Sequence, residues 1–322
     1  MKKYLITVLG RYGDLILATP VFEAIKKFDS KANITVITGR NNYQIIENNP
    51  YIDRIIIYDK NPLKLFSFIF KLKSTQYDCY VDVKVHYSKE SRYIAKMVKA
   101  DVKIGFNNPN LTKVFDIDFT LDKPDEITHF TSNSLWAISK SGIEINDLLL
   151  RPNLFQNDDS KEYVKLFLIS HSITNFSLLN ISATSENRIW PINKWNELVI
   201  STNLNTKKVI VTFAPENKLL AQNFSKINNN LIFFKSRKFS DVISISAKAD
   251  EIITPDTSLV HIASAFDKPL LALYNGLEWN FKKFHPTSSN FVVIHSNKDS
   301  ESISEIPIQE VIEGYNKLQH NS

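Results

Sequence analysis

A glycine and a carboxylate follow the first apolar run of the chain. The run Tyr4–Leu9 has the character of a buried strand, and the sequence GRYGD comes directly after it and opens a predicted helix. Gly13 allows a tight turn or the close approach of a ligand. Asp14 has two interpretations. It is either a helix N-cap that accepts a backbone N–H, or a general base that takes a proton from an attacking hydroxyl group.

A second polar segment, TPDTSLVH at residues 254–261, also follows a predicted strand and opens a helix. Asp256, Thr257 and Ser258 crowd the helix start, where unpaired backbone N–H groups and the helix dipole attract phosphate. His261 lies four residues after Thr257 and therefore on the same helix face. The segment is either an Asp/Thr cap followed by a core histidine, or a cradle for a diphosphate to which His261 adds a donor.

Two further segments place a cation and an acid after predicted strands. In SATSENRIWP, Arg188 could hold a phosphate through two hydrogen bonds. The alternative is a solvated loop charge beside Trp190, which would pack the start of the next helix. In FAPE, Glu216 could bind the vicinal hydroxyls of a ribose, as acids do in other Rossmann-like folds.

The elements that position these segments alternate between strand and helix. Strands are predicted over residues 4–9, 33–38, 53–58, 77–83, 102–105, 176–182, 208–213, 231–234, 251–254, 270–274 and 291–294. Helices are predicted over residues 15–28, 43–48, 63–72, 91–98, 131–141, 192–202, 218–227, 239–248, 258–266 and 308–318. This alternation is typical of parallel sheets with helices on both faces.

A break in the pattern at residues 151–159 (RPNLFQNDD) predicts a linker. We therefore expect two Rossmann-like domains, over residues 1–155 and 160–322, facing each other across a cleft. The C-terminal helix is a candidate to pack back on the first domain. In such folds ligands bind at the carboxyl ends of the strands, where all four polar segments fall.

The composition excludes several classes of protein. The formal net charge of +5 is compatible with an anionic ligand or an acidic membrane face, but it is not typical of a nucleic-acid-binding protein. The single cysteine, Cys79, excludes an internal disulfide and fits a reducing, cytoplasmic setting. The absence of GxGxxG, P-loop, GxSxG and HExxH motifs argues against dehydrogenases, P-loop enzymes, serine hydrolases and zinc sites.

Neither a membrane span nor a signal peptide is predicted. No uninterrupted apolar run reaches the roughly 18 residues of a span. The N-terminal apolar stretch is short and broken by Gly10 and Arg11, so it predicts a strand. The stretch KNPLKLFSFIFKLK, residues 60–73, interleaves Phe and Leu with Lys. It is either a helix that covers the sheet with solvated lysines, or a helix that touches a membrane surface.

In their order along the chain, the four polar segments resemble glycosyltransferase family 9, the bacterial lipopolysaccharide heptosyltransferases. DTSLVHIASAFDKP, residues 256–269, is similar to the family's D-T-G-x-x-H-x-A-A-x-x-x-x-P signature. GDLILATP, residues 13–20, is similar to its G-D-x-x-x-x-x-P segment, and NRIWP, residues 187–191, to its K-x-W-P segment. The resemblance covers nearly the whole chain.

This resemblance implies a GT-B fold and an inverting, metal-independent transfer of heptose from ADP-heptose to a lipid-linked lipopolysaccharide or lipooligosaccharide core. It assigns the acceptor to the first domain and the nucleotide sugar to the second. The only small-molecule partner it implies is the ADP-sugar donor, with no separate cofactor and no metal. It also implies a cytoplasmic enzyme, with peripheral contact to the inner-membrane surface as a further expectation, and no nucleic-acid partner.

Carried over by position, Asp14 is the general base of this reaction. The residues expected to bind the donor are Gly13, Thr184, Arg188, Glu216, Asp256, Thr257, Ser258 and His261. The diphosphate leaving group gains negative charge, and without a metal that charge must be met by Arg188 and by helix N–H groups. Glu216 is expected to hold the ribose.

Three places depart from the family pattern. Arg188 stands where a lysine is usual, and Ser258 stands where the signature has glycine. Before Gly13, Arg11 and Tyr12 stand where small polar or aliphatic residues are common. These departures leave open a family member that uses another nucleotide sugar or another acceptor. An epimerase of sugar nucleotides on the GT-B fold and a non-catalytic sugar-nucleotide binder are the remaining alternatives.

Overall fold

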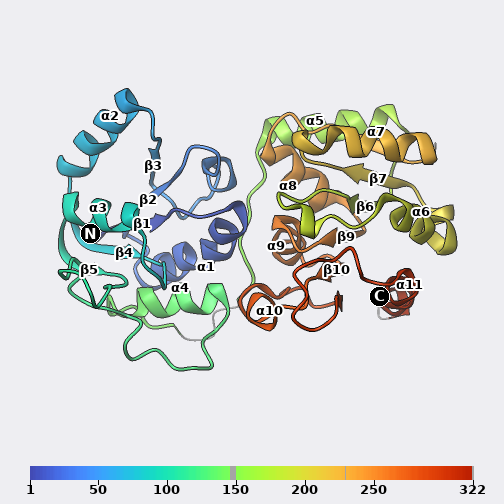
Figure 1. The fold of residues 1–322 in the computed structure, drawn as a ribbon. Coiled ribbons are helices and arrows are strands. Elements are labelled where there is room, and N and C mark those ends of the chain that lie inside the picture. Colours follow the sequence, from blue (N-terminus) through green and yellow to red (C-terminus); the bar gives the residue numbers. More distant parts are fainter. Residues whose placement is uncertain (146–149, 229, 321–322) are drawn as a thin grey trace. The chain divides into compact units, whose positions relative to one another are not determined.

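Two separate parallel sheets organise the chain. The computed structural model describes residues 1–145, 150–228 and 230–320. The chain divides into a first domain over Met1–Phe155 and a second domain over Gln156–Ser322 (Figure 1). Each domain has its own sheet and its own hydrophobic core, and each is described by itself.

The first domain contains a five-stranded parallel sheet in the order β3-β2-β1-β4-β5. Its strands are β1 (Lys3–Val8), β2 (Asn33–Gly39), β3 (Arg54–Tyr58), β4 (Gln76–Asp82) and β5 (Lys99–Ile104). Its helices are α1 (Tyr12–Phe28), α2 (Pro62–Lys73), α3 (Lys89–Met97) and α4 (Phe130–Ser139), with a 3₁₀ turn η1 (Tyr43–Ile45). Because β1 lies in the centre, α1 begins at the middle of the sheet's carboxyl edge.

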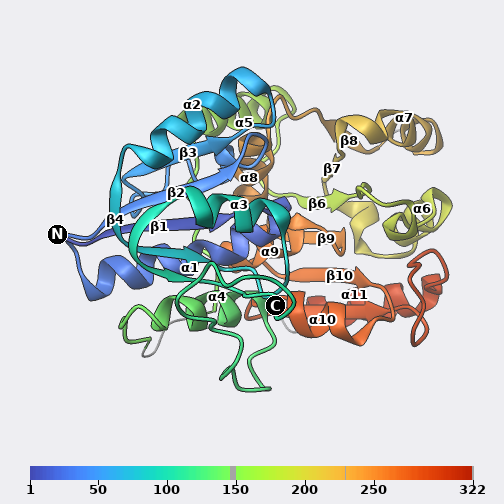
Figure 2. The ribbon, with the colours of Figure 1, turned by 60° about the vertical axis from the view of Figure 1, so that its left-hand side comes forward.

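Helices cover both faces of this sheet. Figure 2 shows α2 and α3 on one face and α1 and α4 on the other. The core under α2 and α3 joins Leu5 of β1, Phe68 of α2, Tyr80 of β4 and Ile94 of α3. These side chains are all buried, so the hydrophobic effect fixes both helices on the sheet.

The second domain contains a six-stranded parallel sheet in the order β11-β10-β9-β6-β7-β8. Its strands are β6 (Ser177–Asn180), β7 (Val209–Thr212), β8 (Ile232–Phe234), β9 (Glu251–Pro255), β10 (Leu270–Tyr274) and β11 (Phe291–His295). Its helices are α5 (Asp158–Ser170), α6 (Ile192–Ser201), α7 (Lys218–Ile227), α8 (Phe239–Lys248), α9 (Ser258–Ala265), α10 (Glu278–Phe284) and α11 (Ile308–His320). The 3₁₀ turns are η2 (Glu186–Arg188), η3 (Asn203–Thr206) and η4 (Pro215–Asn217).

The C-terminal helix α11 packs on the second domain's own sheet, against β11 and α6. A buried acid fixes it there: Glu251 of β9 accepts hydrogen bonds from the hydroxyl groups of Ser177 (2.5 Å) and Tyr315 (2.8 Å). Lys207 forms an ion pair with the same carboxylate at 3.0 Å. Burial, and then the charge of Glu251, raise the pKa of Tyr315, which therefore stays a hydrogen-bond donor.

The alternating pattern predicted the strands well, but it missed two helices and predicted one helix that the structure does not contain among the described residues. Every predicted strand overlaps an observed one. The predicted linker is wrong from Asp158 onward, where α5 begins because Asn157 caps it by accepting from the Ser160 N–H (3.3 Å). The helices α5 and α10 were not predicted, and the predicted helix over residues 43–48 is only the turn η1.

Candidate functional site

Helix α9 begins at the carboxyl end of β9, in the interior of the second sheet. Thr257 is its N-cap, and the hydroxyl oxygen accepts a hydrogen bond from the Leu259 N–H (3.3 Å). The first turn of α9 contains no acidic residue. Its positive dipole end is therefore not compensated by a carboxylate of its own first turn, which is the condition under which a helix start attracts an anion.

A buried carboxylate holds an arginine beside this helix start. Nη1 of Arg188 lies 3.2 Å from Oδ2 of Asp256 and 3.2 Å from the carbonyl oxygen of Asp256. The Asn280 amide donates to the same Oδ2 (2.7 Å) and also to Oδ1 of Asn275 (3.2 Å). Both contacts of Arg188 with Asp256 use Nη1, so its Nε and Nη2, which make no hydrogen bond to any described residue, can donate to a second anion.

A second amide ties three loops of the same sheet edge together. Asn180 is buried at the end of β6, and its Nδ2 donates to Oγ1 of Thr254 (3.0 Å) and of Thr257 (3.3 Å). Its Oδ1 accepts from the Ser182 hydroxyl (2.9 Å), which in turn accepts from the Ala214 N–H (3.0 Å). The ends of β6, β7 and β9 are therefore linked before any ligand arrives, which is how a binding site is held rigid.

The remaining predicted donor-binding residues differ in their placement. His261 is buried within α9, with its ring tilted against that of Phe284 at a centroid distance of 6.3 Å. Ser258, the first residue of α9, is partly exposed. Thr184 and Glu216 are exposed after β6 and β7, and neither side chain forms a hydrogen bond or ion pair with another described residue.

The structure thus brings Arg188 and Asp256 into one network and Thr257 into a second network beside it, and it leaves Thr184 and Glu216 outside both. The asparagine at the centre of each network, Asn280 in the first and Asn180 in the second, was missed from the sequence. Asn180 carried a signal, because it is a polar residue inside the apolar run FSLLNIS. Asn280 lies in α10, which was not predicted.

In the first domain, the carboxylate of Asp14 folds back on the start of α1. Asp14 is the third residue of the helix, and its Oδ2 accepts a hydrogen bond from the Arg11 N–H (2.9 Å). A Cβ atom on Gly10 would lie 2.1 Å from this Oδ2, so glycine is required there. Gly13 lies within the first turn of α1, so the tight turn expected at Gly13 instead occurs at Gly10 and Arg11.

Helix α1 is anchored along its length, which fixes Asp14. Pro20 cannot donate to the Ile16 carbonyl group, and the Thr19 hydroxyl group donates to it instead (2.7 Å). From α4, the Thr131 hydroxyl group donates to the Leu17 carbonyl oxygen (2.9 Å). The Ile16 carbonyl group is therefore paired despite the proline inside the helix that carries Asp14.

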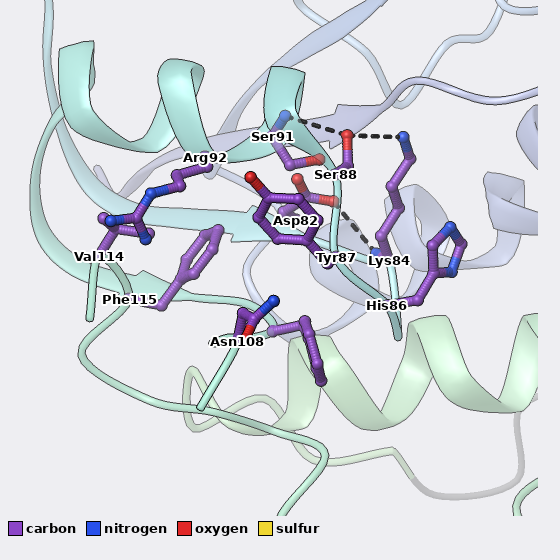
Figure 3. A pocket seen from close by; sticks show the side chains of 11 residues that line it. Asp82, Lys84, His86, Tyr87, Ser88, Ser91, Arg92, Asn108, Val114 and Phe115 are labelled. Carbon is purple, nitrogen blue, oxygen red and sulfur yellow. Dashed lines mark hydrogen bonds between the residues drawn. The ribbon is translucent and has the colours of Figure 1, made fainter. Parts of the chain in front are cut away.

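A pocket lies at the carboxyl end of β4 in the first domain (Figure 3). It is lined by Asp82, Lys84, His86, Tyr87, Ser88, Ser91, Arg92, Phe106, Asn108, Val114 and Phe115. Lys84 donates through Nζ to the hydroxyl oxygen of Ser88 (3.3 Å), the N-cap of α3. Nη1 of Arg92 donates to the Thr112 carbonyl oxygen (2.6 Å).

A buried acid, Asp82, lies at the end of β4 and lines this pocket. Burial raises the pKa of Asp82, against the opposing effects of the Ser91 side chain and of Lys84. The cationic side chains of Lys84 and Arg92 line the same pocket. Two cations beside the aromatic rings of Tyr87 and Phe106 suit an anionic sugar or phosphate group, and the sequence analysis had not identified this pocket.

Within residues 1–145, 150–228 and 230–320, no three His, Cys, Asp or Glu side chains are grouped as ligands of a metal ion. No helix in the described part of the chain combines the length and the apolar character needed to cross a membrane.

Comparisons with known proteins agree with the motif pattern. The model of glycosyltransferase family 9 (heptosyltransferase) matches residues 65–309. Lipopolysaccharide heptosyltransferase 1 of Campylobacter coli is 20% identical over 344 residues, covering 96% of this chain and 97% of that protein.

Two solved structures are similar over their whole length. The glycosyltransferase family 9 protein of Veillonella parvula matches with a TM-score of 0.83 at 18% identity, covering 100% of this chain and 98% of that chain. The Escherichia coli heptosyltransferase WaaC, solved with ADP, matches with a TM-score of 0.78 at 15% identity, covering 98% and 99%. The predicted fold class, two parallel-sheet α/β domains of the GT-B type, is confirmed.

Proposed function

Because the chain belongs to glycosyltransferase family 9, the heptosyltransferase family, and is a glycosyltransferase, we propose that it transfers a heptose from ADP-heptose to a lipopolysaccharide or lipooligosaccharide core. The transfer is metal-independent and inverts the anomeric carbon. The observation that carries this proposal is the Arg188 guanidinium group, held by the buried Asp256 at the start of α9. The names of the similar Campylobacter coli and Escherichia coli proteins support the donor and the acceptor class.

The second domain binds the nucleotide sugar in this proposal. Free Nε and Nη2 groups of Arg188 donate to the diphosphate, together with the N–H groups and the hydroxyl groups at Thr257 and Ser258. These donors strengthen as the leaving phosphate gains charge, so they stabilise the transition state more than the bound substrate. Thr184 and His261 add contacts to the diphosphate, and Glu216 binds the ribose.

Asp256 acts in this scheme as a positioning residue. A carboxylate beside a diphosphate would repel it, but Arg188 compensates its charge and Asn280 donates a hydrogen bond to it in the buried network. Asp256 affects donor binding by orienting the guanidinium group of Arg188.

The first domain binds the acceptor and supplies Asp14 as the general base. Its Oδ2 is held by the Arg11 N–H, which leaves Oδ1 to take the proton from the acceptor hydroxyl group. The resulting alkoxide-like oxygen attacks the anomeric carbon from the face opposite the diphosphate, which inverts the configuration. Gly13 lies in the same helix turn and lets the donor approach the backbone closely.

The pocket at the end of β4 binds an anionic group of the acceptor. Support comes from the cationic side chains of Lys84 and Arg92 that line it, because such side chains bind anionic groups. An acceptor rooted in a lipid also places the enzyme at the cytoplasmic face of the inner membrane. Nucleic acid has no role in this proposal.

A thermal-shift panel with ADP-, UDP- and GDP-sugars tests the donor, because a ligand that binds only the folded state raises the melting temperature. We expect ADP-heptose to give the largest shift, and the Arg188→Ala variant to lose most of it. A larger shift with a UDP- or GDP-sugar would contradict the proposed donor.

Product analysis with and without a core acceptor then tests the reaction. We expect ADP release and heptose transfer only when the acceptor is present, and unchanged rates in EDTA. Conversion of the sugar nucleotide without an acceptor would identify an epimerase, and binding without turnover in the presence of acceptor would identify a sugar-nucleotide binder.

A further inference from the structure

Helix α2 of the first domain exposes a stripe of large apolar side chains. Leu63, Phe66 and Phe70 are 85%, 77% and 69% exposed. Their spacing of three and four residues places them on one face of the helix. A contiguous row of exposed apolar side chains indicates a binding surface, whereas single exposed apolar residues are ordinary.

The opposite face of α2 explains why this stripe is not part of the core. Phe68 and Leu72 are buried, and Leu65 and Ile69 are half-buried against the sheet. The helix packs over β3, the edge strand, and beside α3 (Figure 1). The helix is therefore apolar on two opposite faces, and among the described residues of the first domain only one of these faces is covered.

Lysines flank the exposed stripe. Lys60, Lys64, Lys71 and Lys73 lie along the helix and its approach, and no acidic residue occurs from residue 60 to residue 77. Lys60 pairs with Glu90 (3.1 Å) and Lys64 pairs with Asp59 (3.2 Å). Lys71 and Lys73 are exposed and have no acidic partner among the described residues, so they carry uncompensated positive charge.

From these observations we propose that α2 docks on an anionic lipid bilayer. The stripe of Leu63, Phe66 and Phe70 enters the region between the lipid head groups and the acyl chains, and Lys71 and Lys73 contact lipid phosphates. An amphipathic helix that lies in the interface plane has this arrangement. The inference extends the membrane location of the proposed function by assigning the surface that makes the contact.

A second copy of the chain fits this stripe less well. In a two-fold symmetric pair, α2 would face its own copy and one lysine-rich segment without acids would pack on another. Even at the roughly 150–250 Å² that an aromatic side chain buries, three side chains fall short of the roughly 800 Å² per partner in a stable interface. A bilayer has neither restriction, because its negative charge complements the lysines.

Sedimentation with lipid vesicles tests the docking directly. The vesicles contain either phosphatidylcholine alone or phosphatidylcholine with phosphatidylglycerol, and no acceptor, so the result does not depend on heptose transfer. We expect binding to the anionic vesicles, at least tenfold weaker binding to the neutral ones, and a loss at high salt. Equal binding to both, or none to either, overturns the proposal.

Matched variants assign the contact to α2. Replacing Leu63, Phe66 and Phe70 with serine should weaken binding to anionic vesicles at least tenfold, since it removes the inserted side chains. The control replaces Leu166, Ile169 and Leu219 with serine, which are 56%, 63% and 68% exposed on α5 and α7. This control should bind as the wild type does, and equal loss in both variants contradicts the assignment.

Neutralising the two unpaired lysines tests the electrostatic part. Lys71→Gln with Lys73→Gln should weaken binding to the anionic vesicles about tenfold and leave the weak binding to neutral vesicles unchanged. Lys161→Gln with Lys165→Gln on α5 is the charge-matched control. If both pairs reduce binding equally, net charge rather than α2 drives the contact and the assignment fails.

A fluorescent label can report insertion at one site. Burial raises the pKa of the Cys79 thiol to about 12, so the native cysteine resists labelling. Ser67→Cys then places an environment-sensitive dye beside the stripe, and Gln222→Cys on α7 serves as the control. We expect a blue shift on anionic vesicles only for the label at residue 67. A shift at both sites or at residue 222 alone overturns the proposal.

Self-association through the stripe is the alternative to membrane binding, and analytical ultracentrifugation tests it. If the serine variant of the stripe changes a dimer into a monomer in analytical ultracentrifugation while vesicle binding persists, the stripe serves a second copy and the bilayer proposal is wrong.

Heptose transfer to a delipidated core acceptor separates the membrane proposal from the proposed function. The stripe variant should transfer heptose to this acceptor as fast as the wild type does. Absence of transfer in the wild type would contradict the proposed function and leave the membrane proposal standing.

Discussion

Helices α1 and α9 both begin after a strand in the interior of a parallel sheet, but only α1 has an acidic residue in its first turn. In α1 the carboxylate of Asp14 occupies the helix start by accepting the Arg11 N–H. In α9 the first turn carries no acid, and the nearby Asp256 is paired with Arg188. One helix start already contains its anion, and the other presents cationic and N–H donors.

This difference separates two kinds of chemistry on one type of scaffold. A carboxylate fixed at a helix start is available to accept a proton, whereas a helix start without an acid can bind a phosphate group. The surrounding networks match these tasks. Gly10 makes room for the Asp14 carboxylate, while Asn180 and Asn280 fix the loops and the acid that orient Arg188.

The largest expected effect comes from Asp14→Asn. The amide oxygen can still accept the Arg11 N–H, so α1 and donor binding should persist. The lost base should lower kcat at least ~100-fold, the usual size of a general-base effect. Quantifying transferred heptose checks this, with Asp158→Asn as control, because Asp158 lies in the first turn of α5 with 96% of its side chain exposed. A rate near that of the wild type would remove Asp14 from the role.

Arg188→Ala should act on binding instead. Losing charged hydrogen bonds to the diphosphate should weaken ADP-heptose binding by roughly 1.5–3 kcal/mol, measured by isothermal titration calorimetry. Arg188→Lys should lose less, because charge remains while the fork geometry is lost. The alanine variant leaves Asp256 buried without its cation, so Arg188→Ala with Asp256→Asn is the control for misfolding. Unchanged affinity for ADP-heptose in the alanine variant and in the double variant would argue against a phosphate contact of Arg188.

A smaller effect is expected from Asn280→Ala, which removes a neutral donor from Asp256. Arg188 then loses one constraint on its orientation, and we expect donor binding to weaken by about 0.5–1.5 kcal/mol. Asn223→Ala on the exposed face of α7 is the matched control. Equal affinities of the two variants would show that Asn280 does not position the site.

The smallest effect tests the two helix caps themselves. Thr257→Ala removes the side-chain cap of α9 and should lower the free energy of unfolding by about 1 kcal/mol, while Thr257→Ser should retain it. The N-cap residue of α1, Arg11, makes no side-chain capping bond. Arg11→Ala should therefore leave stability unchanged, and chemical denaturation of both variants checks the contrast. Equal losses would mean that the caps do not differ.

The strands were predictable because the interior strands of a parallel sheet are covered on both faces and read as continuous apolar runs. The residues at their ends were predictable as candidates, since Asp14, Arg188 and Asp256 all stand just after such runs. The sequence could not predict which of them pair. The Asn280 contact depends on the fold of α10, a seven-residue helix whose short pattern carries little periodicity. The pairing of Asn180 with Thr254 spans 74 residues and exists only because β6 and β9 are neighbours.

For helix α2 as well, the sequence could not predict which residues pack against the rest of the domain. The interleaved Phe and Leu residues left open whether the segment covers the sheet or touches a membrane. The structure assigns one apolar row, with Phe68 and Leu72, to the core and leaves another, with Phe66 and Phe70, exposed. Only the burial of one face in the fold reveals that the helix has a second apolar face.

The central claim is that Arg188 binds the phosphates of the donor, and competition titrations with ADP and adenosine test it most directly. Both ligands displace a labelled ADP-sugar from the wild type and from Arg188→Ala. The account predicts that the substitution weakens ADP by roughly 1.5–3 kcal/mol and leaves adenosine unchanged, because only ADP carries the phosphates. Equal weakening of both ligands, or no change in either, would contradict it.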